Sequence, residues 1–200
     1  MKLINITAKR YPGRTADHYY IENLAEAFYM KLQQKFVFIV CNTNENVLPE
    51  LPVLSVSVPS FLKRTAVFFF WIPWYWFENN QKNERTIFFT NDQNLLVLLI
   101  FWKKLLFLSY EIASDWHMLS LSWKDRFIAR HSDYSMSTSK KLELAIRKLS
   151  PLVQVNTIYG AVDIEQYKKE YDKKNLRDRL GLSNKKFLIG YVGLFKTMGM

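Results

Sequence analysis

The sequence has 200 residues, 49% of them hydrophobic and 23% charged, with a formal net charge of +10 at pH 7. This composition is typical of a folded rather than a disordered chain, and the length is enough for one α/β domain with a sizeable core. The charge is uneven, at +2 in residues 1–100 and +8 in residues 101–200. A basic balance favours a phosphate-rich partner (anionic lipid, nucleotide or nucleic acid) without choosing among them.

The chain has a single cysteine, Cys41, which excludes a disulfide framework within one chain and fits a reducing compartment. Cys41 ends the apolar run 36–40 and is expected to be a small buried hydrophobe. The apolar stretch at residues 3–8 is too short for a signal peptide. We therefore expect a cytoplasmic protein.

Apolar runs and helical spacings alternate along the chain. The residues at 3–8, 36–41, 53–58, 85–90, 105–110, 134–137 and 153–158 are expected to form strands. A first helix opens near Thr15 and Asp17, and its apolar face is Ile21, Leu24, Ala25, Phe28 and Leu32. Further helices are expected at 65–77, 92–104 and 122–131, and after Ser139.

The segment 65–77 reads TAVFFFWIPWYWF and contains no charged residue. It has 13 residues, against about 20 needed to cross a bilayer as a helix, so no transmembrane helix is predicted. Two alternatives stay open. The segment packs its aromatics into the core, or it lies at a membrane surface through Lys63, Arg64, Trp71, Trp74 and Trp76.

Strands alternating with helices predict a Rossmann-like domain, an α/β fold with a parallel sheet flanked by helices on both faces, over residues 1–160. Residues 161–186 are mostly charged and form a linker with a basic, solvent-exposed helix. The apolar run 187–192 then predicts the first strand of a second domain, which is truncated within residues 187–200.

The turn after the first strand is a candidate ligand site, because ligands of parallel α/β sheets bind at the carboxyl ends of strands. Gly13 would let the backbone approach a phosphate at the helix N-terminus, and Arg14, Thr15 and His18 could contact it. The alternative is an ordinary loop capped by Thr15.

Glu111 and Asp115 follow the expected fifth strand and are candidates for binding sugar hydroxyls or for proton transfer. Alternatively they only cap the next turn. The three histidines, His18, His117 and His131, lack metal-ligand spacing, so no metal site is expected. No dinucleotide-binding or P-loop glycine motif is present.

Four stretches together resemble family 4 glycosyltransferases of the GT-B class. They are the opening strand with Tyr11-Pro12-Gly13 and Glu22-Asn23-Leu24-Ala25; Asp133 to Lys140, similar to that family's "adxvixvS" segment; Gly160 to Tyr167, similar to "NGVDxExF"; and Leu176 to Leu182 with Ile189 to Gly193, similar to "LRxxLGL…vgyvG". The chain departs from the pattern at Gly160-Ala161 and at Leu194, and it has no histidine at the end of the expected fifth strand.

The resemblance implies an N-terminal, acceptor-side domain of a two-domain enzyme that transfers a sugar from a nucleotide sugar to a glycan or lipid-linked acceptor. Retention of configuration and no essential metal or other cofactor are implied as well. The residues it would place at the cleft are Thr138, Ser139 and Lys140; those at the hinge are Gly160, Val162 and Asp163; those on the phosphate side of the second domain are Gly193 and Lys196.

The sequence therefore predicts a glycosyltransferase half that is inactive alone, with peripheral attachment to the cytoplasmic membrane face as a further expectation. The alternative is a non-catalytic Rossmann-like module that docks on anionic membrane or on a partner protein. A nucleic-acid partner is disfavoured, because the basic residues are interspersed with acids and no binding motif is present.

Overall fold

A computed structural model describes residues 1–10, 16–41, 51–79, 84–159, 172–183 and 187. The chain separates into two compact units, residues 1–160 and 161–200, and each is considered by itself.

The first unit is built on a seven-stranded sheet whose order is β3-β2-β1-β4-β5-β6-β7. The strands are β1 (Lys2–Arg10), β2 (Phe36–Cys41), β3 (Val53–Val56), β4 (Thr86–Thr90), β5 (Glu111–Trp116), β6 (Tyr134–Ser137) and β7 (Gln154–Thr157). Every neighbouring pair is parallel. The α/β class with a parallel sheet, expected from the alternation of elements, is confirmed.

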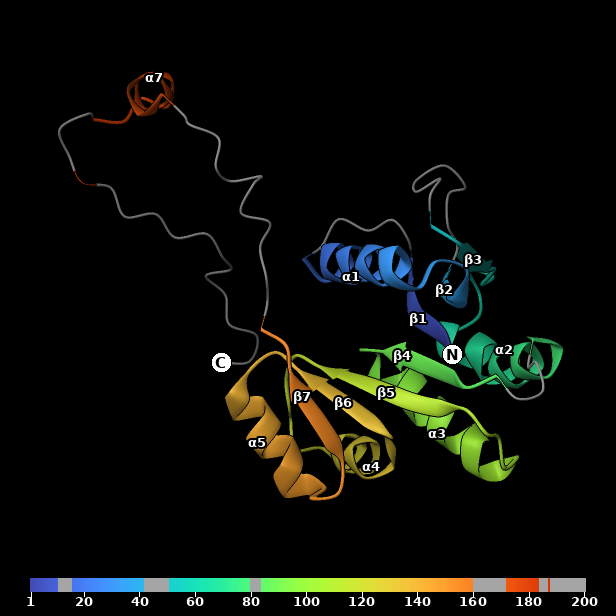
Figure 1. Cartoon of the computed structure of the whole chain (residues 1–200). Coiled ribbons are helices and arrows are strands. Elements are labelled where there is room, and N and C mark those ends of the chain that lie inside the picture. The colour runs from blue at the N-terminus through green and yellow to red at the C-terminus, as the bar shows by residue number, and fades with distance from the viewer. Residues whose placement is uncertain (11–15, 42–50, 80–83, 160–171, 184–186, 188–200) are drawn as a thin grey trace. The chain divides into compact units, whose positions relative to one another are not determined.

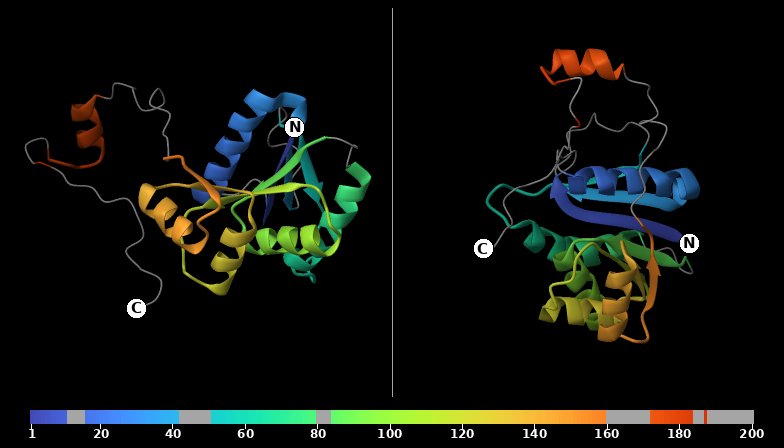
Figure 2. Two further views of the ribbon diagram at one scale, coloured as in Figure 1. Left: turned by 60° about the horizontal axis from the view of Figure 1, so that its bottom comes forward. Right: turned by 90° about the vertical axis from the view of Figure 1, so that its left-hand side faces the viewer.

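Helices cover both faces of this sheet (Figures 1 and 2). They are α1 (Ala16–Leu32), which a short 3-10 turn η1 (Gln33–Lys35) follows, then α2 (Arg64–Asn79), α3 (Gln93–Leu105), α4 (Trp123–His131) and α5 (Lys140–Leu149). The strand order reverses between β1 and β4. Since crossovers are right-handed, α1 lies on one face and α2 to α5 lie on the other.

The core consists of two clusters, one on each face. Leu3 packs in the α1 cluster with Ile21 and Ala25, whereas its neighbour Ile4 packs against α2 and α3. This alternation follows from the period of two along a strand, and burial on both faces explains the continuous apolar runs seen in the sequence. Cys41 is buried in the cluster that contains Ile4, on the side of α2 and α3, and its burial was expected.

Helix α2 is divided between core and solvent. Phe68, Ile72, Tyr75 and Trp76 are buried, and Trp76 packs edge-on against Tyr110 with ring centroids 5.0 Å apart. The expectation that Trp76 lies at a membrane surface is therefore wrong, because its indole is 4% exposed inside the core. Trp71 is half-buried and stacks on Tyr75, while Trp74 is 57% exposed.

Pro73 lies inside α2 without ending the helix. Proline has no N–H, so the carbonyl four residues earlier, that of Phe69, loses its usual helical donor. The indole Nε1 of Trp102 in α3 donates to this oxygen at 2.7 Å. This bond satisfies the orphaned carbonyl and joins α2 to α3.

The fifth strand begins six residues later than the sequence suggested. Residues 105–110 were expected to be a strand, but α3 continues to Leu105, and Phe107 turns the chain with a φ of 52°. Tyr110 is buried, and its hydroxyl donates to the Leu99 carbonyl at 2.6 Å. The expectation is wrong because the apolar residues that suggested it, Leu105 and Phe107, are 53% and 92% exposed.

The true β5 was overlooked because its sequence, EIASDW, carries buried polar groups. Ser114 is fully buried, yet its hydroxyl pairs with that of Ser135 at 2.8 Å and accepts from the Trp116 indole at 2.8 Å. Satisfied in this way, the polar side chains do not oppose burial.

In the second unit the structure describes the helix α7 (Lys173–Arg179), capped by Asp172 and without a buried residue among those described. Its exposure agrees with the solvated charged helix expected there. The expected strand 187–192 lies outside the described residues except for Phe187, and the finer boundaries at 161, 186 and 187 stay predictions.

Candidate functional site at the carboxyl edge of the sheet

A pocket of about 300 Å³ lies at the carboxyl ends of β1, β4 and β5, where the strand order reverses. This is the position at which open α/β sheets bind their ligands. It is lined by Lys9 of β1, by Asn91, Asp92, Gln93 and Leu96 at the start of α3, and by Asp115, Trp116, His117, Met118 and Ser120 at the end of β5.

Asp115 and His117 form the polar centre of this pocket. His117 Nε2 lies 3.0 Å from Asp115 Oδ2. The Asp115 side chain is 1% exposed, whereas that of His117 is 32% exposed. Asp115 Oδ1 is buried and has no hydrogen-bond partner among the described residues. A carboxylate that holds one imidazole nitrogen fixes the tautomer and the orientation of the ring.

Tyr20 of α1 contacts the His117 ring without itself lining the pocket. Its ring meets that of His117 edge-on, with centroids 4.5 Å apart and an interplanar angle of 89°. Burial, with the Asp115 carboxylate as a second cause, raises the pKa of Tyr20 well above its ordinary value. The phenol is therefore neutral at physiological pH and keeps its proton to donate.

The segment that carries His117 is held in place by Asp125. The Asp125 carboxylate is fully buried and accepts from the Ser120 backbone N–H at 2.9 Å, the Ser120 hydroxyl at 2.7 Å and the Ser122 backbone N–H at 3.0 Å. Gln93 Nε2 donates to its other oxygen at 2.7 Å. Asp125 thus fixes the β5–α4 connection and, as the N3 residue of a capping box, starts α4.

A second pocket of about 350 Å³ adjoins the first through His117. Its other lining residues are Leu119, Leu121, Ser139, Lys141, Leu142 and Ala145. Since His117 lines both, its imidazole stands between the pocket at β1 and β4 and the one at the start of α5. A bound molecule could contact the histidine from either side.

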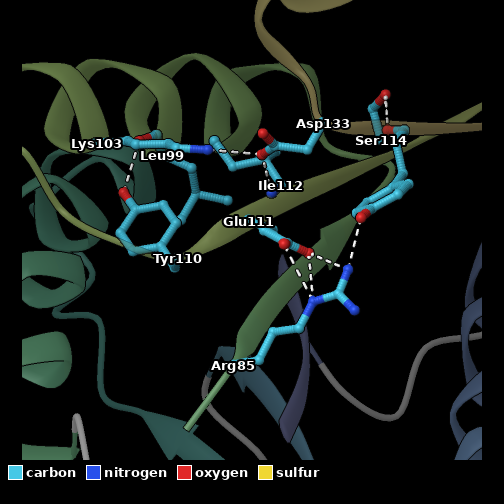
Figure 3. A network of polar contacts seen from close by, with 9 residues as sticks. Arg85, Leu99, Lys103, Tyr110, Glu111, Ile112, Ser114 and Asp133 are labelled. Carbon is cyan, nitrogen blue, oxygen red and sulfur yellow. Dashed lines mark hydrogen bonds and ion pairs between the residues drawn. The ribbon is translucent and has the colours of Figure 1, made fainter. Parts of the chain in front are cut away.

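Among the residues predicted for the site, Asp115 lies at the carboxyl edge as expected. Glu111 does not, because it is the first residue of β5 and pairs with Ile87 near the start of β4. The carboxylate of Glu111 accepts from Arg85 at 3.0 and 2.8 Å, and Arg85 also donates to the Tyr134 hydroxyl at 2.6 Å (Figure 3). The prediction that Glu111 and Asp115 share a site is therefore wrong.

Figure 3 also shows why this amino edge is a structural network. Lys103 Nζ and the backbone N–H of Ile112 both donate to Asp133 Oδ2 at 2.7 Å. The Arg85 pKa is raised, first by its hydrogen bond to Glu111. These bonds join α3, β4, β5 and β6 at the edge opposite the pocket, so Glu111 contributes to pairing of the strands.

The three residues predicted at the start of α5 differ in their surroundings. Ser139 caps α5 by accepting from the Leu142 N–H at 3.3 Å, and it lines the second pocket. Thr138 donates its backbone N–H to Trp116 at 3.3 Å. The Lys140 side chain is 62% exposed, and its ammonium pairs with Glu143 of the same helix at 2.9 Å. Its charge therefore stabilises α5.

The remaining predicted site residues lie outside the described residues. They are Gly13, Arg14 and Thr15 in the first loop, Gly160, Val162 and Asp163 at the hinge, and Gly193 and Lys196 in the second unit. His18 belongs to α1, but its side chain is not described. Their roles stay predictions.

His117 is the principal residue that sequence reasoning missed. The chain was expected to lack a histidine at the end of the fifth strand, and the shift of β5 to Glu111–Trp116 places one immediately after it. Tyr20 was missed too, because it comes from a helix on the other face. The signal available for His117 was its spacing of two from Asp115.

Two negative findings apply to the described part of the chain. Within it, no group of three or more His, Cys, Asp or Glu side chains is arranged to hold a metal ion. No helix there has both the length and the apolar character needed to cross a bilayer.

Neither a protein-family model nor a curated protein sequence matches this chain. Solved structures do. The apo form of the lipopolysaccharide outer core galactosyltransferase WaaB matches with a TM-score of 0.59 and 19% identity, over 82% of this chain and 47% of that one. HepE of Anabaena in complex with UDP-glucose matches with a TM-score of 0.62 and 16% identity, over 92% and 50%.

A sucrose-phosphate synthase chain from Thermosynechococcus elongatus matches with a TM-score of 0.57 and 14% identity, over 90% of this chain and 99% of that one. The present chain thus spans about half the length of the WaaB and HepE chains. At these identities the likeness shows the fold: a Rossmann-like parallel sheet flanked by helices, as in the N-terminal half of GT-B structures.

Proposed function

We propose that this chain is the acceptor-side half of a GT-B-type glycosyltransferase that uses a nucleotide sugar. The observation that carries the proposal is the buried Asp115 paired with His117 in a pocket at the switch point of the sheet. It is supported by the fold shared with a galactosyltransferase and with a protein solved in complex with UDP-glucose. The donor we propose is accordingly a UDP-sugar.

In this proposal Asp115 and His117 position a sugar. Asp115 holds one imidazole nitrogen and so fixes the ring where it lines both pockets, within reach of a sugar bound in either one. The buried Asp115 Oδ1, which has no hydrogen-bond partner among the described residues, is a second acceptor for a hydroxyl that enters the first pocket. The protonated phenol of Tyr20 lies beside His117 and can donate to the Asp115 carboxylate, which helps to orient the pair.

Negative charge develops on the nucleoside diphosphate as it leaves, and cationic groups and helix N-termini stabilise it. Lys9 lines the pocket and α3 begins beside it. The resemblance to family 4 enzymes assigns most diphosphate contacts to the second domain. We therefore propose that residues 1–200 alone do not turn over, that transfer proceeds with retention and without an essential metal, and that the acceptor is a glycan or lipid-linked glycan.

The test is a transfer assay on the complete reading frame that contains these 200 residues, with UDP-, GDP- and ADP-sugars and with residues 1–200 alone for comparison. We expect transfer from a UDP-sugar by the longer protein, unaffected by EDTA, and a product whose anomeric proton coupling matches that of the donor. No transfer from any of these donors by the longer protein would overturn the proposal, and turnover by residues 1–200 alone would overturn the division of labour.

A further inference from the structure

One stripe of α2 is aromatic and exposed to solvent. Phe70, Trp74 and Phe77 are 72%, 57% and 66% exposed. Their spacing of four and three residues places them on one side of the helix, opposite the buried Phe68 and Ile72. An amphipathic helix normally turns a polar side to water, but this one turns large aromatics to it.

The stripe continues onto α3. Phe69 contacts Phe70 on its own helix and Phe101 on α3, with ring centroids 5.1 and 5.8 Å apart. Phe101 is 42% exposed and Leu105, one turn further, is 53% exposed. We call Phe70, Trp74, Phe77, Phe101 and Leu105 the aromatic ridge. Single exposed apolar residues are ordinary, whereas a continuous group of this kind marks an interaction surface.

The charges around the ridge are mostly of one sign. Lys63 immediately precedes α2, Arg64 is its first residue, and Lys104 lies in the last turn of α3, where the neighbouring Lys103 is paired with Asp133. The two helices contain a single acid, Glu78, at the end of α2. A surface with exposed tryptophan and phenylalanine, bordered by basic residues, complements a bilayer that contains anionic lipid.

We propose that the aromatic ridge docks the protein on the surface of an anionic membrane, with α2 and α3 lying along the headgroup layer. A second copy of this chain is the poorer occupant. In a two-fold contact the same patch meets itself, so a surface bordered by Lys63, Arg64 and Lys104 would meet an equally basic surface in a chain of net charge +10. The surface is distinct from the Asp115–His117 pocket, and docking does not depend on sugar transfer.

The structure also corrects which tryptophans carry the docking. Trp76 is 4% exposed, so its removal would damage the core. The informative variant is Trp74→Ala/Phe77→Ala, because both side chains are exposed and their removal leaves the core intact. Its matched control is Tyr19→Ala in α1, an aromatic residue with the same 57% exposure on the opposite face of the sheet.

The experiment is co-sedimentation of the 200-residue chain with vesicles of phosphatidylcholine alone and of equal parts phosphatidylcholine and phosphatidylglycerol. We expect binding to the anionic vesicles, weakened about tenfold by Trp74→Ala/Phe77→Ala and unchanged by Tyr19→Ala. Lys63→Gln should weaken it about fivefold. Brominated lipid should quench the wild-type tryptophan emission, and Trp74→Phe should abolish most of that quenching while preserving binding.

Absence of binding to anionic vesicles would overturn the proposal, as would equal losses for the ridge variant and the Tyr19 control. Concentration-dependent dimers that the ridge variant abolishes, seen by sedimentation velocity without lipid, would assign the ridge to a second copy and overturn it too. Circular dichroism of each variant verifies that the fold is retained.

Discussion

The imidazole Nε2 of His117 lies 3.0 Å from Asp115 Oδ2 at the point where β5 reaches the carboxyl edge of the sheet. One partner is buried and the other is a third exposed. Burial of the carboxylate keeps water from competing for the imidazole, whereas the imidazole itself is partly exposed and lines both pockets. The pair therefore combines a fixed ring orientation with a ring that a bound ligand can contact.

Replacing His117 by alanine should lower kcat/KM for sugar transfer by about a hundredfold or more, the range seen when one positioned proton-transfer or hydrogen-bonding group is removed. Asp115→Asn should lower kcat/KM as well, since an amide at this position can favour the other tautomer of the His117 imidazole. Steady-state kinetics of the complete reading frame measure both. Thermal unfolding should show a lower midpoint for His117→Ala, because the buried Asp115 carboxylate loses this hydrogen-bond partner, and circular dichroism at the assay temperature verifies that the variant is folded.

Glu111→Gln is the matched control for this pair of variants. It changes a carboxylate of the same strand, but at the amino edge, where Glu111 binds Arg85. Transfer rates should stay within about twofold of the wild type. A loss as large as that of His117→Ala would contradict the assignment of the site to the carboxyl edge.

Much of the fold could be predicted from the sequence, because the strands buried on both faces are continuous apolar runs. Phe36–Cys41 and Tyr134–Ser137 have the expected bounds, and the first helix buries the expected apolar face. Among the elements that the structure describes, the one misplaced was β5. Its buried Ser114 is satisfied by Ser135 on β6 and by the Trp116 indole, and pairing of that kind does not show in a single segment.

The candidate site was predicted only in part for the same reason. Asp115 was found because a carboxylate after a strand is conspicuous. His117 was missed once the strand was placed six residues early. Tyr20 and Asp125 were not foreseeable, because they reach His117 or the loop that carries it from other helices. Contacts between elements depend on tertiary packing, which the local pattern does not encode.

The bond between Trp102 and the Phe69 carbonyl predicts a specific cost. Trp102→Phe keeps an aromatic ring against Phe69 but removes the donor, which leaves the carbonyl freed by Pro73 without its partner. We expect a loss of about 1 kcal/mol in the free energy of unfolding, measured by urea denaturation. Trp123→Phe, at an indole that is 66% exposed, is the control and should be near neutral.

The two sides of α2 should differ sharply in their contribution to stability. Trp76→Ala removes a buried indole that packs on Phe88 and Tyr110, and should cost about 3 to 5 kcal/mol. Trp74→Ala, one half-turn earlier on the exposed stripe, should change the free energy of unfolding by less than about 0.5 kcal/mol. Similar costs for both would mean that the ridge is packed, which contradicts the exposure on which membrane docking rests.

Glu143 makes the stability of the domain depend on pH in the acid range. It is 6% exposed, and hydrogen bonds from Thr157, Lys140 and Arg147, in that order of effect, lower its pKa from 4.5 to about 2. A carboxylate whose pKa is lower in the folded state stabilises the fold above the unfolded value. That contribution is complete above pH 4.5 and is lost as the pH falls to about 2.

Urea unfolding of the wild type and of Glu143→Gln should therefore show a constant difference in midpoint above pH 4.5, a shrinking one below it and none near pH 2. Thr157→Val keeps the carboxylate but removes the largest of the three causes, so the decline should begin at the same pH as in the wild type, end at a higher pH and be smaller in total. Glu26→Gln, at an exposed position of α1, should match the wild type throughout. A Glu143→Gln difference that persists unchanged to pH 2 would show that the glutamate acts through packing alone, because only the ionised form gains from Lys140 and Arg147.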